Sequence, residues 1–330
     1  MIDETVVSSQ HSSIKARPGF RLGLDENGLG PRLGPLIVTA VCAELNEAGA
    51  VRFARRLPQS IRKDLNDSKA LVSSQNYSLA EAWARALSFR MTGIEPSCPN
   101  DVLAAISAES VRALQLLCPK STRAQCWGTD TEQFISNEEQ RIRIDRHLSK
   151  LEQLGMNIHA VRSELVCTGK LNALKEQGIH RFSADLHAME HLILTLGAFA
   201  GAKVEAVCGK VGGIGKYEPF FGPLAGRLHT AIEEGQALSS YYFPQLGTIH
   251  FVRDADASDP FVMMASLVGK YLRELLMARI ASFYADQVEE KFRRPSGYHD
   301  PITTEFVAQT KKARRRLGII QDCFERRAAD

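Results

Sequence analysis

Two adjacent carboxylates, Asp25 and Glu26, follow a short apolar stretch inside the segment GLDENGLGPRLGP, residues 23–35. Neighbouring carboxylate oxygens can hold hard divalent cations, and glycines let the main chain come close to a phosphate or a sugar. A plain structural turn would use the same glycines and prolines. The segment therefore predicts either a turn or a site for metal and phosphate, and other residues must decide between them.

The glycine spacing argues against a nucleotide cofactor. Gly28, Gly30 and Gly34 are spaced G-x-G-x-x-x-G, whereas the dinucleotide fingerprint requires G-x-G-x-x-G at the start of a helix. Here a β-branched stretch, residues 36–45, follows instead. The segment GKVGGIGKY, residues 209–217, likewise departs from the phosphate-loop pattern and predicts only a flexible basic loop.

A second candidate site lies in HAMEH, residues 187–191. On a helix, His187 and His191 could bind one zinc ion while Glu190 serves as a base. No third ligand is evident, and ordinary buried or surface histidines give the same pattern. A zinc hydrolase therefore stays an alternative hypothesis.

The elements expected to position these residues mix strands and helices. FRLGLD, LIVTAVCAEL (residues 36–45) and KVEAVC (residues 203–208) read as strands, with Asp25 at a strand end. Helices are predicted after a serine cap in SSQNYSLAEAWARAL, in NEEQRIRIDRHLSKLEQLGM, from Ser183 as a cap, and from Asp259 as a cap with Pro260 in the first turn. In LNDSKAL, Asp67 or Ser68 would cap the next helix.

Length and composition indicate an ordinary globular protein. The 330 residues are 44% apolar and 24% charged, which suits one large domain with an insertion, or two domains. We expect a mobile tail at 1–17, a domain at 18–285 with an insertion at about 96–162, and a basic helical segment at 286–330. No apolar leader or membrane span is present in the sequence, which predicts a soluble, cytoplasmic protein without membrane contact.

Cysteine spacing and charge bear on three further classes of protein: disulfide-linked proteins, zinc ribbons and nucleic-acid binders. The seven cysteines are scattered without any C-x-x-C pair, so neither a disulfide framework nor a zinc ribbon is expected. The net charge of +3 does not by itself indicate a nucleic-acid partner. KKARRR, residues 311–316, concentrates positive charge near the C-terminus, although a solvated helix face explains that run equally simply.

Four segments, in order, resemble ribonuclease HII, the type 2 ribonuclease H family. LDENGLGPRLGP resembles the family's D-E-x-G-R-G-P-x-x-G-P, and LNDSKAL resembles L-x-D-S-K-x-L. DADASDPFVMMASLVGK is similar to the segment in which an aspartate, here Asp256, precedes A-S-I-V-A-K by nine residues. SGYHDPITTEF resembles S-G-Y-x-x-D-P-x-T of archaeal and eukaryotic members. The matches span about residues 21–306, and residues 96–162 have no match.

The resemblance implies an α/β fold, with a ribonuclease H-like mixed sheet flanked by helices, a helical insertion and a C-terminal helical segment. It implies cleavage of RNA in RNA–DNA hybrids, or of ribonucleotides embedded in DNA, with Mg²⁺ or Mn²⁺ as cofactor. Asp25, Glu26 and Asp256 would be the catalytic metal ligands. Cations between clustered carboxylates would offset their repulsion, and two such ions can activate water and stabilise a leaving oxygen.

The resemblance also implies a set of substrate-binding residues. Lys69 would meet the phosphate, and the backbone of Gly28 and Gly30 would reach the ribose 2′-hydroxyl that distinguishes RNA from DNA. Tyr298 would stack beside the ribonucleotide sugar. The remaining candidates are Arg32, as a substitute for a missing arginine, and Ser266 and Lys270, which share a helix face at i, i+4 spacing.

Two departures from the family pattern bear on activity. Leu29 replaces the arginine of G-R-G, and the family's third aspartate falls at Cys208 or Gly209, neither of which suits a hard cation. Asp254, Asp259 and Glu205 are nearby acids that could compensate. Three hypotheses follow: a working hybrid endonuclease, a catalytically inactive nucleic-acid-binding homologue on the same fold, and the zinc hydrolase. The oligomeric state stays unknown.

Overall fold

The computed structural model describes residues 14, 16–53, 55, 57–73, 76–116, 118, 125–129, 132–211, 213–289 and 291–328. The expected N-terminal tail, residues 1–17, lies almost entirely outside the described residues. Within the described part no helix is both long and apolar enough to cross a membrane. All seven cysteines are free thiols.

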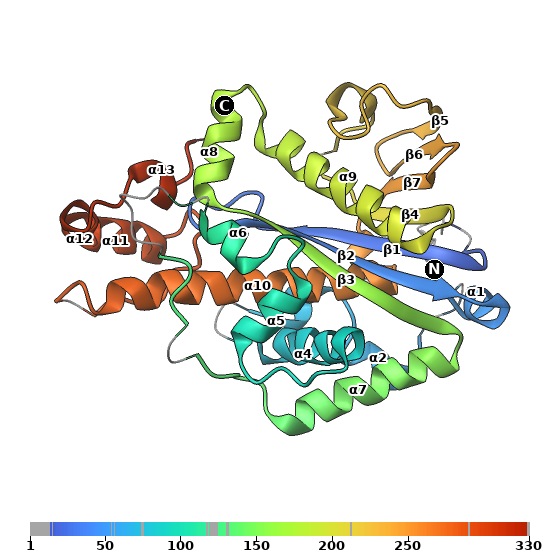
Figure 1. Ribbon diagram of the computed structural model, residues 1–330, viewed down its shortest axis with the longest axis horizontal. Coiled ribbons are helices and arrows are strands. Elements are labelled where there is room, and N and C mark those ends of the chain that lie inside the picture. Colours follow the sequence, from blue (N-terminus) through green and yellow to red (C-terminus); the bar gives the residue numbers. More distant parts are fainter. Residues whose placement is uncertain are drawn as a thin grey trace, which may run out of the picture.

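Seven strands form one mixed sheet in the order β3-β2-β1-β4-β7-β6-β5 (Figure 1). β1 pairs antiparallel with β2 and parallel with β4, and β4 pairs parallel with β7. Because β1 and β4 are parallel neighbours, their C-terminal ends meet at one edge of the sheet, with Leu24 opposite Cys208. The strands are β1 (Gly19–Asn27), β2 (Leu36–Leu45), β3 (Met156–Val166), β4 (Val204–Gly209), β5 (Thr230–Glu234), β6 (Leu238–Phe243) and β7 (Gly247–Val252).

Helices cover both faces of this sheet, which confirms the predicted mixed α/β class (Figure 1). α9 (Arg181–Ala200) packs on one face, where its apolar side chains meet Leu22 and Leu24. α10 (Pro260–Ala285) and α4 (Ser78–Thr92) pack on the other face. Residues of β2 are buried almost throughout because the strand is covered on both sides.

The predicted helix starts are partly correct. Asp259 caps α10 as expected, since its Oδ1 accepts from the amides of Phe261 at 2.9 Å and Val262 at 3.3 Å. Asp67 likewise caps α3 (Ser68–Leu71) by accepting from the amide of Lys69. Ser183 is not a cap, because α9 begins two residues earlier, at Arg181. The serine cap predicted for α4 is also wrong: Tyr77 precedes that helix and makes no capping bond through its side chain.

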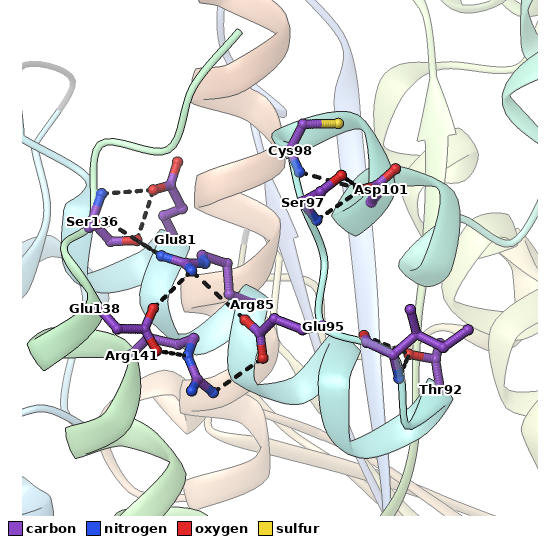
Figure 2. A network of polar contacts seen from close by, with 11 residues as sticks. Glu81, Arg85, Thr92, Glu95, Ser97, Cys98, Asp101, Ser136, Glu138 and Arg141 are labelled. Atoms are coloured by element: carbon purple, nitrogen blue, oxygen red, sulfur yellow. Dashed lines mark hydrogen bonds and ion pairs between the residues drawn. The ribbon is translucent and has the colours of Figure 1, made fainter.

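The predicted insertion, residues 96–162, is only partly separate from the sheet. Its helices are α5 (Pro99–Ile106), α6 (Val111–Leu116) and α7 (Glu138–Gln153), but from Met156 onward the chain forms β3, which pairs with β2. Figure 2 shows how this part is fixed to α4: Glu81 accepts from the amide and the hydroxyl of Ser136, and Arg85 pairs with Glu138. The insertion is therefore a helical layer bound to α4 and not an independent domain.

The C-terminal segment packs against the far end of α10 (Figure 1). Leu33, Tyr284 and Phe306 lie in its small apolar core, so the segment is tied both to α10 and to the loop after β1. The remaining helices are α1 (Glu47–Phe53), α2 (Gln59–Arg62), α8 (Thr168–Glu176), α11 (Pro301–Gln309), α12 (Lys311–Arg316) and α13 (Gln321–Phe324), with single 3₁₀ turns at Glu218–Phe220 and Ala255–Ala257.

Candidate active site

Asp25 and Glu26 lie side by side at the C-terminal end of β1. Alternation along the strand turns Asp25 toward α10 and Glu26 toward α9. Asp25 is buried, and burial together with the charge of Glu26 raises its pKa well above the ordinary value, although a hydrogen bond with Ser266 opposes the shift. Burial and the charge of Asp185 raise the pKa of Glu26 to about 8. Two acids with raised pKa values at a strand end are typical of a functional site.

Asp256 and Lys69 reach the same edge of the sheet from two other segments. Asp256 lies in the 3₁₀ turn Ala255–Ala257 after β7, and Lys69 lies in α3. The Nζ of Lys69 is 3.5 Å from Oδ2 of Asp256, and 80% of the Lys69 side chain is exposed. The negative charge of Asp256 raises the pKa of Lys69, and Asp256 in turn adds to the raised pKa values of Asp25 and Glu26. Three motifs that are far apart in sequence therefore meet at one point.

Two residues predicted to bind substrate instead bond to the protein. Ser266 is buried, and its hydroxyl lies 2.9 Å from that of Ser68. Lys270 donates to the carbonyls of Val72 at 2.7 Å and Ser68 at 3.2 Å. Both bonds fix α3 against α10, so in this structure Ser266 and Lys270 position the segment that presents Lys69.

The glycine-rich loop is held by the SGY segment. Gly28 has φ of +92°, and a Cβ there would lie 2.7 Å from Nε of Arg273, so this position requires glycine. Gly30 has open space around it. The carbonyl of Gly297 accepts from the amides of Arg32 at 2.8 Å and Leu33 at 2.9 Å. These bonds place the loop next to Tyr298, the residue after Gly297.

Tyr298 is presented at the surface by this contact. Its side chain is about half exposed, and the guanidinium of Arg273 lies 4.9 Å from the ring centroid. A cation over one ring face leaves an aromatic group held in place beside the loop. The structure therefore places Tyr298 near the glycines with which it was grouped from sequence.

The C-terminal segment is bound to the glycine-rich loop through two arginines, one in the loop and one near the C-terminus. Arg32, the predicted substitute, forms an ion pair with Glu325 at 2.5 Å. Arg326 is buried and donates to the carbonyls of Gly28 at 2.6 Å and Gly34 at 2.8 Å. Arg326 was not predicted from the sequence, because its partners lie almost 300 residues away and no pattern of spacing joins them.

None of the three acids considered as replacements for the missing aspartate points into the site. Glu205 and Asp259 are both paired with the buried Arg21, and Asp259 also caps α10. Asp254 is exposed in a left-handed conformation with φ of 54°. The segment is therefore not an extended strand in which the side chains of Asp254 and Asp256 would point to the same side. The position that faces the acids is Gly209: a Cβ built there would lie 2.9 Å from Oδ1 of Asp25.

A fourth acid, Asp185 of α9, was missed by the sequence analysis. It is 1% exposed, and its charge acts on Asp25, Glu26 and Cys208. A signal was present, because Asp185 precedes the apolar Met189 by four residues and so interrupts the buried face of an amphipathic helix.

The donor set fits a hard divalent cation in its chemistry. The acids at the sheet edge offer only carboxylate oxygens, the ligands that Mg²⁺ and Mn²⁺ prefer. Both oxygens of Asp185 are buried and have no hydrogen-bond partner in the part of the chain that the structure describes. As arranged, no three His, Cys, Asp or Glu side chains among the described residues are grouped so that they could hold one ion. Asp256 is paired with Lys69 instead.

The HAMEH residues are engaged separately. His187 Nε2 lies 3.0 Å from the carbonyl of Phe220, and His191 Nδ1 lies 2.9 Å from Glu164. Glu190 is fully buried and accepts from two backbone amides of the loop that follows β4. The zinc hydrolase hypothesis gains no support from this geometry.

Comparison with known proteins finds similar solved structures but no matching sequence. No family model and no curated protein sequence matches the chain. Similar solved structures include the ribonuclease H2 from Pyrococcus horikoshii OT3, with TM-score 0.42, 14% identity and coverage of 92% of both chains. Another is Bst ribonuclease HIII in complex with Mn²⁺, with TM-score 0.45 and 12% identity over 98% of this chain and 72% of that chain. A third is ribonuclease HII from Archaeoglobus fulgidus in a complex with PCNA, with TM-score 0.36 and 15% identity over 92% and 93% of the two chains.

All of these solved structures are ribonucleases H of type 2 or type 3, the family that the four sequence motifs resemble. At such low identities and TM-scores the likeness says nothing about activity, which depends on the side chains at the sheet edge.

Proposed function

We propose that this protein is a divalent-metal-dependent endonuclease of the type 2 ribonuclease H kind, acting on RNA–DNA hybrids or on ribonucleotides embedded in DNA. The observation that supports this most is the meeting of Asp25, Glu26, Asp256 and Lys69 at one edge of the sheet. These four residues belong to three of the motifs found in the sequence, and the fold brings the three segments together.

Each group then has a chemical role. Asp25, Glu26 and Asp256 would hold Mg²⁺ or Mn²⁺, which would activate water and stabilise the leaving oxygen of a phosphodiester. Lys69 is exposed and would donate to a phosphate of the bound strand. The open backbone at Gly30 can approach a ribose closely, and Tyr298 offers an exposed ring face to a sugar or base.

Positive charge next to the loop supports a nucleic-acid substrate. A hollow of about 670 Å³ lies between the C-terminal helices, and its lining includes Arg32, Lys311 and Arg315. Arg314 of the basic run is buried and bonds to backbone and to Thr310, so that residue is structural. The exposed members of the run can contact phosphates without reading sequence.

One observation favours the alternative of an inactive binding homologue. The position facing Asp25 is Gly209, which has no side chain, so a carboxylate present in the family pattern is absent. The two functions separate in one experiment. An endonuclease cuts an RNA–DNA hybrid with Mg²⁺ or Mn²⁺ and loses this activity in Asp25→Asn and Asp256→Asn. A binding homologue retains the hybrid in a salt-sensitive manner and yields no metal-dependent product.

A further inference from the structure

Asp185 is a buried carboxylate to which no described residue donates a hydrogen bond. It lies on the inner face of α9, is 1% exposed, and leaves both oxygens unsatisfied. Glu190 on the same helix is equally buried, but its Oε2 accepts from the amides of Gly222 at 3.0 Å and Leu224 at 2.8 Å. Burying a carboxylate with no partner is unfavourable, so an acid retained in this state needs a reason.

Protonation alone does not satisfy Asp185. A neutral carboxyl group has one O–H donor and further acceptor capacity, and it too needs a partner for its proton. Neither oxygen of Asp185 has such a partner. A cation beside the carboxylate would satisfy both its charge and its lone pairs.

Asp185 lies close to the ends of β1 and β4. Its charge acts on Asp25 and Glu26 at the end of β1, and on Cys208 at the end of β4. The neighbouring Gly209 has no side chain, and a Cβ built there would lie 2.9 Å from Oδ1 of Asp25. β4 thus lacks an acid at its C-terminal end, and α9, which packs on the sheet, supplies Asp185 there.

Resting on the proposed function, we propose that Asp185 is a further ligand of the divalent cation and provides from α9 the carboxylate that β4 lacks. The acidic set then consists of Asp25, Glu26, Asp185 and Asp256, drawn from β1, α9 and the turn after β7. The four carboxylates match the charge of about two divalent cations.

The test measures metal binding directly. Mn²⁺ is titrated into metal-free protein by calorimetry and by electron paramagnetic resonance of the free ion, for the wild type, Asp185→Asn, Asp25→Asn and Glu190→Gln. We expect Asp185→Asn and Asp25→Asn each to weaken Mn²⁺ binding by at least about 10-fold, as losses around metal sites commonly do. Glu190→Gln, a buried acid of the same helix with its own partners, should bind as the wild type does.

Thermal unfolding without metal gives a second measurement. Asp185→Asn should melt at the same temperature as the wild type or higher, because it removes an unpaired buried acid. Unchanged Mn²⁺ affinity in Asp185→Asn would overturn the inference, and so would failure of this variant to fold. Failure of the wild type to bind Mn²⁺ would remove the proposed function as well. The double variant Asp185→Asn with Gly209→Asp should regain affinity over Asp185→Asn alone.

Discussion

The ammonium group of Lys69 lies 3.5 Å from the carboxylate of Asp256, although the two residues are 187 positions apart in the sequence. The lysine is held by its neighbours, since Ser68 bonds to Ser266 and Lys270 binds two carbonyls around α3. These bonds fix α3, which presents the exposed ammonium group of Lys69 at the acidic edge.

Replacing Lys69 with alanine should weaken binding to an RNA–DNA hybrid without loss of stability. The side chain is 80% exposed and, among the described residues, forms an ion pair only with Asp256, so its removal disturbs no core. The slope of log binding constant against log salt should fall by about 1, because one phosphate contact is lost. Fluorescence anisotropy at several salt concentrations measures this, with Lys63→Ala as the exposed control. An unchanged slope would remove Lys69 from the substrate contact.

Metal-free protein should lose stability as the pH rises from about 5 to 8. Glu26 has a pKa of about 8 in the folded state and an ordinary value of 4.5, so between these values the folded state binds the extra proton. Stability then falls with rising pH, because the unfolded state binds fewer protons. Melting temperatures in chelator across this range test the sign, and Glu26→Gln should flatten the curve. A melting temperature that rises steadily over the range would contradict the account.

Replacing Arg326 with methionine should loosen the glycine-rich loop. Its guanidinium donates to the carbonyls of Gly28 and Gly34, and removing it takes these donors away and leaves Gly34 only the hydroxyl of Thr168 at 3.3 Å. We expect a loss of roughly 2 to 4 kcal/mol in the free energy of unfolding. Amide exchange should also become faster at Arg32 and Leu33, whose amides bond to Gly297. Wild-type exchange rates at both amides would show that Arg326 does not order the loop.

Replacing Arg21 with leucine should destabilise the whole domain. Arg21 is buried between Glu205 of β4 and Asp259 at the start of α10, and its loss leaves two acids without their cation. The expected cost is about 3 to 5 kcal/mol by denaturant unfolding. Arg143→Leu removes a more exposed ion pair with Asp64 and should cost about 1 kcal/mol or less. Equal costs for the two variants would mean that the Arg21 pairs are not structural.

Much of this architecture was predictable because local patterns determine it. The strand Leu36–Leu45 and the Asp259 cap of α10 follow from a β-branched run and from Asp-Pro at a helix start. The convergence of Asp25, Lys69 and Asp256 was predictable only through the motifs, since composition and periodicity do not define it.

The parts that were missed depend on contacts between distant segments. Arg326 acts on carbonyls near the other end of the chain, and Asp185 depends on how α9 lies under β1 and β4. Most of β3 was assigned to an insertion because residues 96–162 match no family motif, whereas its pairing with β2 makes it a strand of the sheet. In each case tertiary packing, and not local propensity, determined the outcome.

The measurement that tests the central claim most directly is cleavage of two end-labelled substrates, a DNA duplex with one ribonucleotide and a full RNA–DNA hybrid, with Mg²⁺ or Mn²⁺. The account predicts metal-dependent products from the wild type that disappear in Asp25→Asn and Asp256→Asn. Folded wild-type protein that binds either duplex but yields no product with either metal would contradict it.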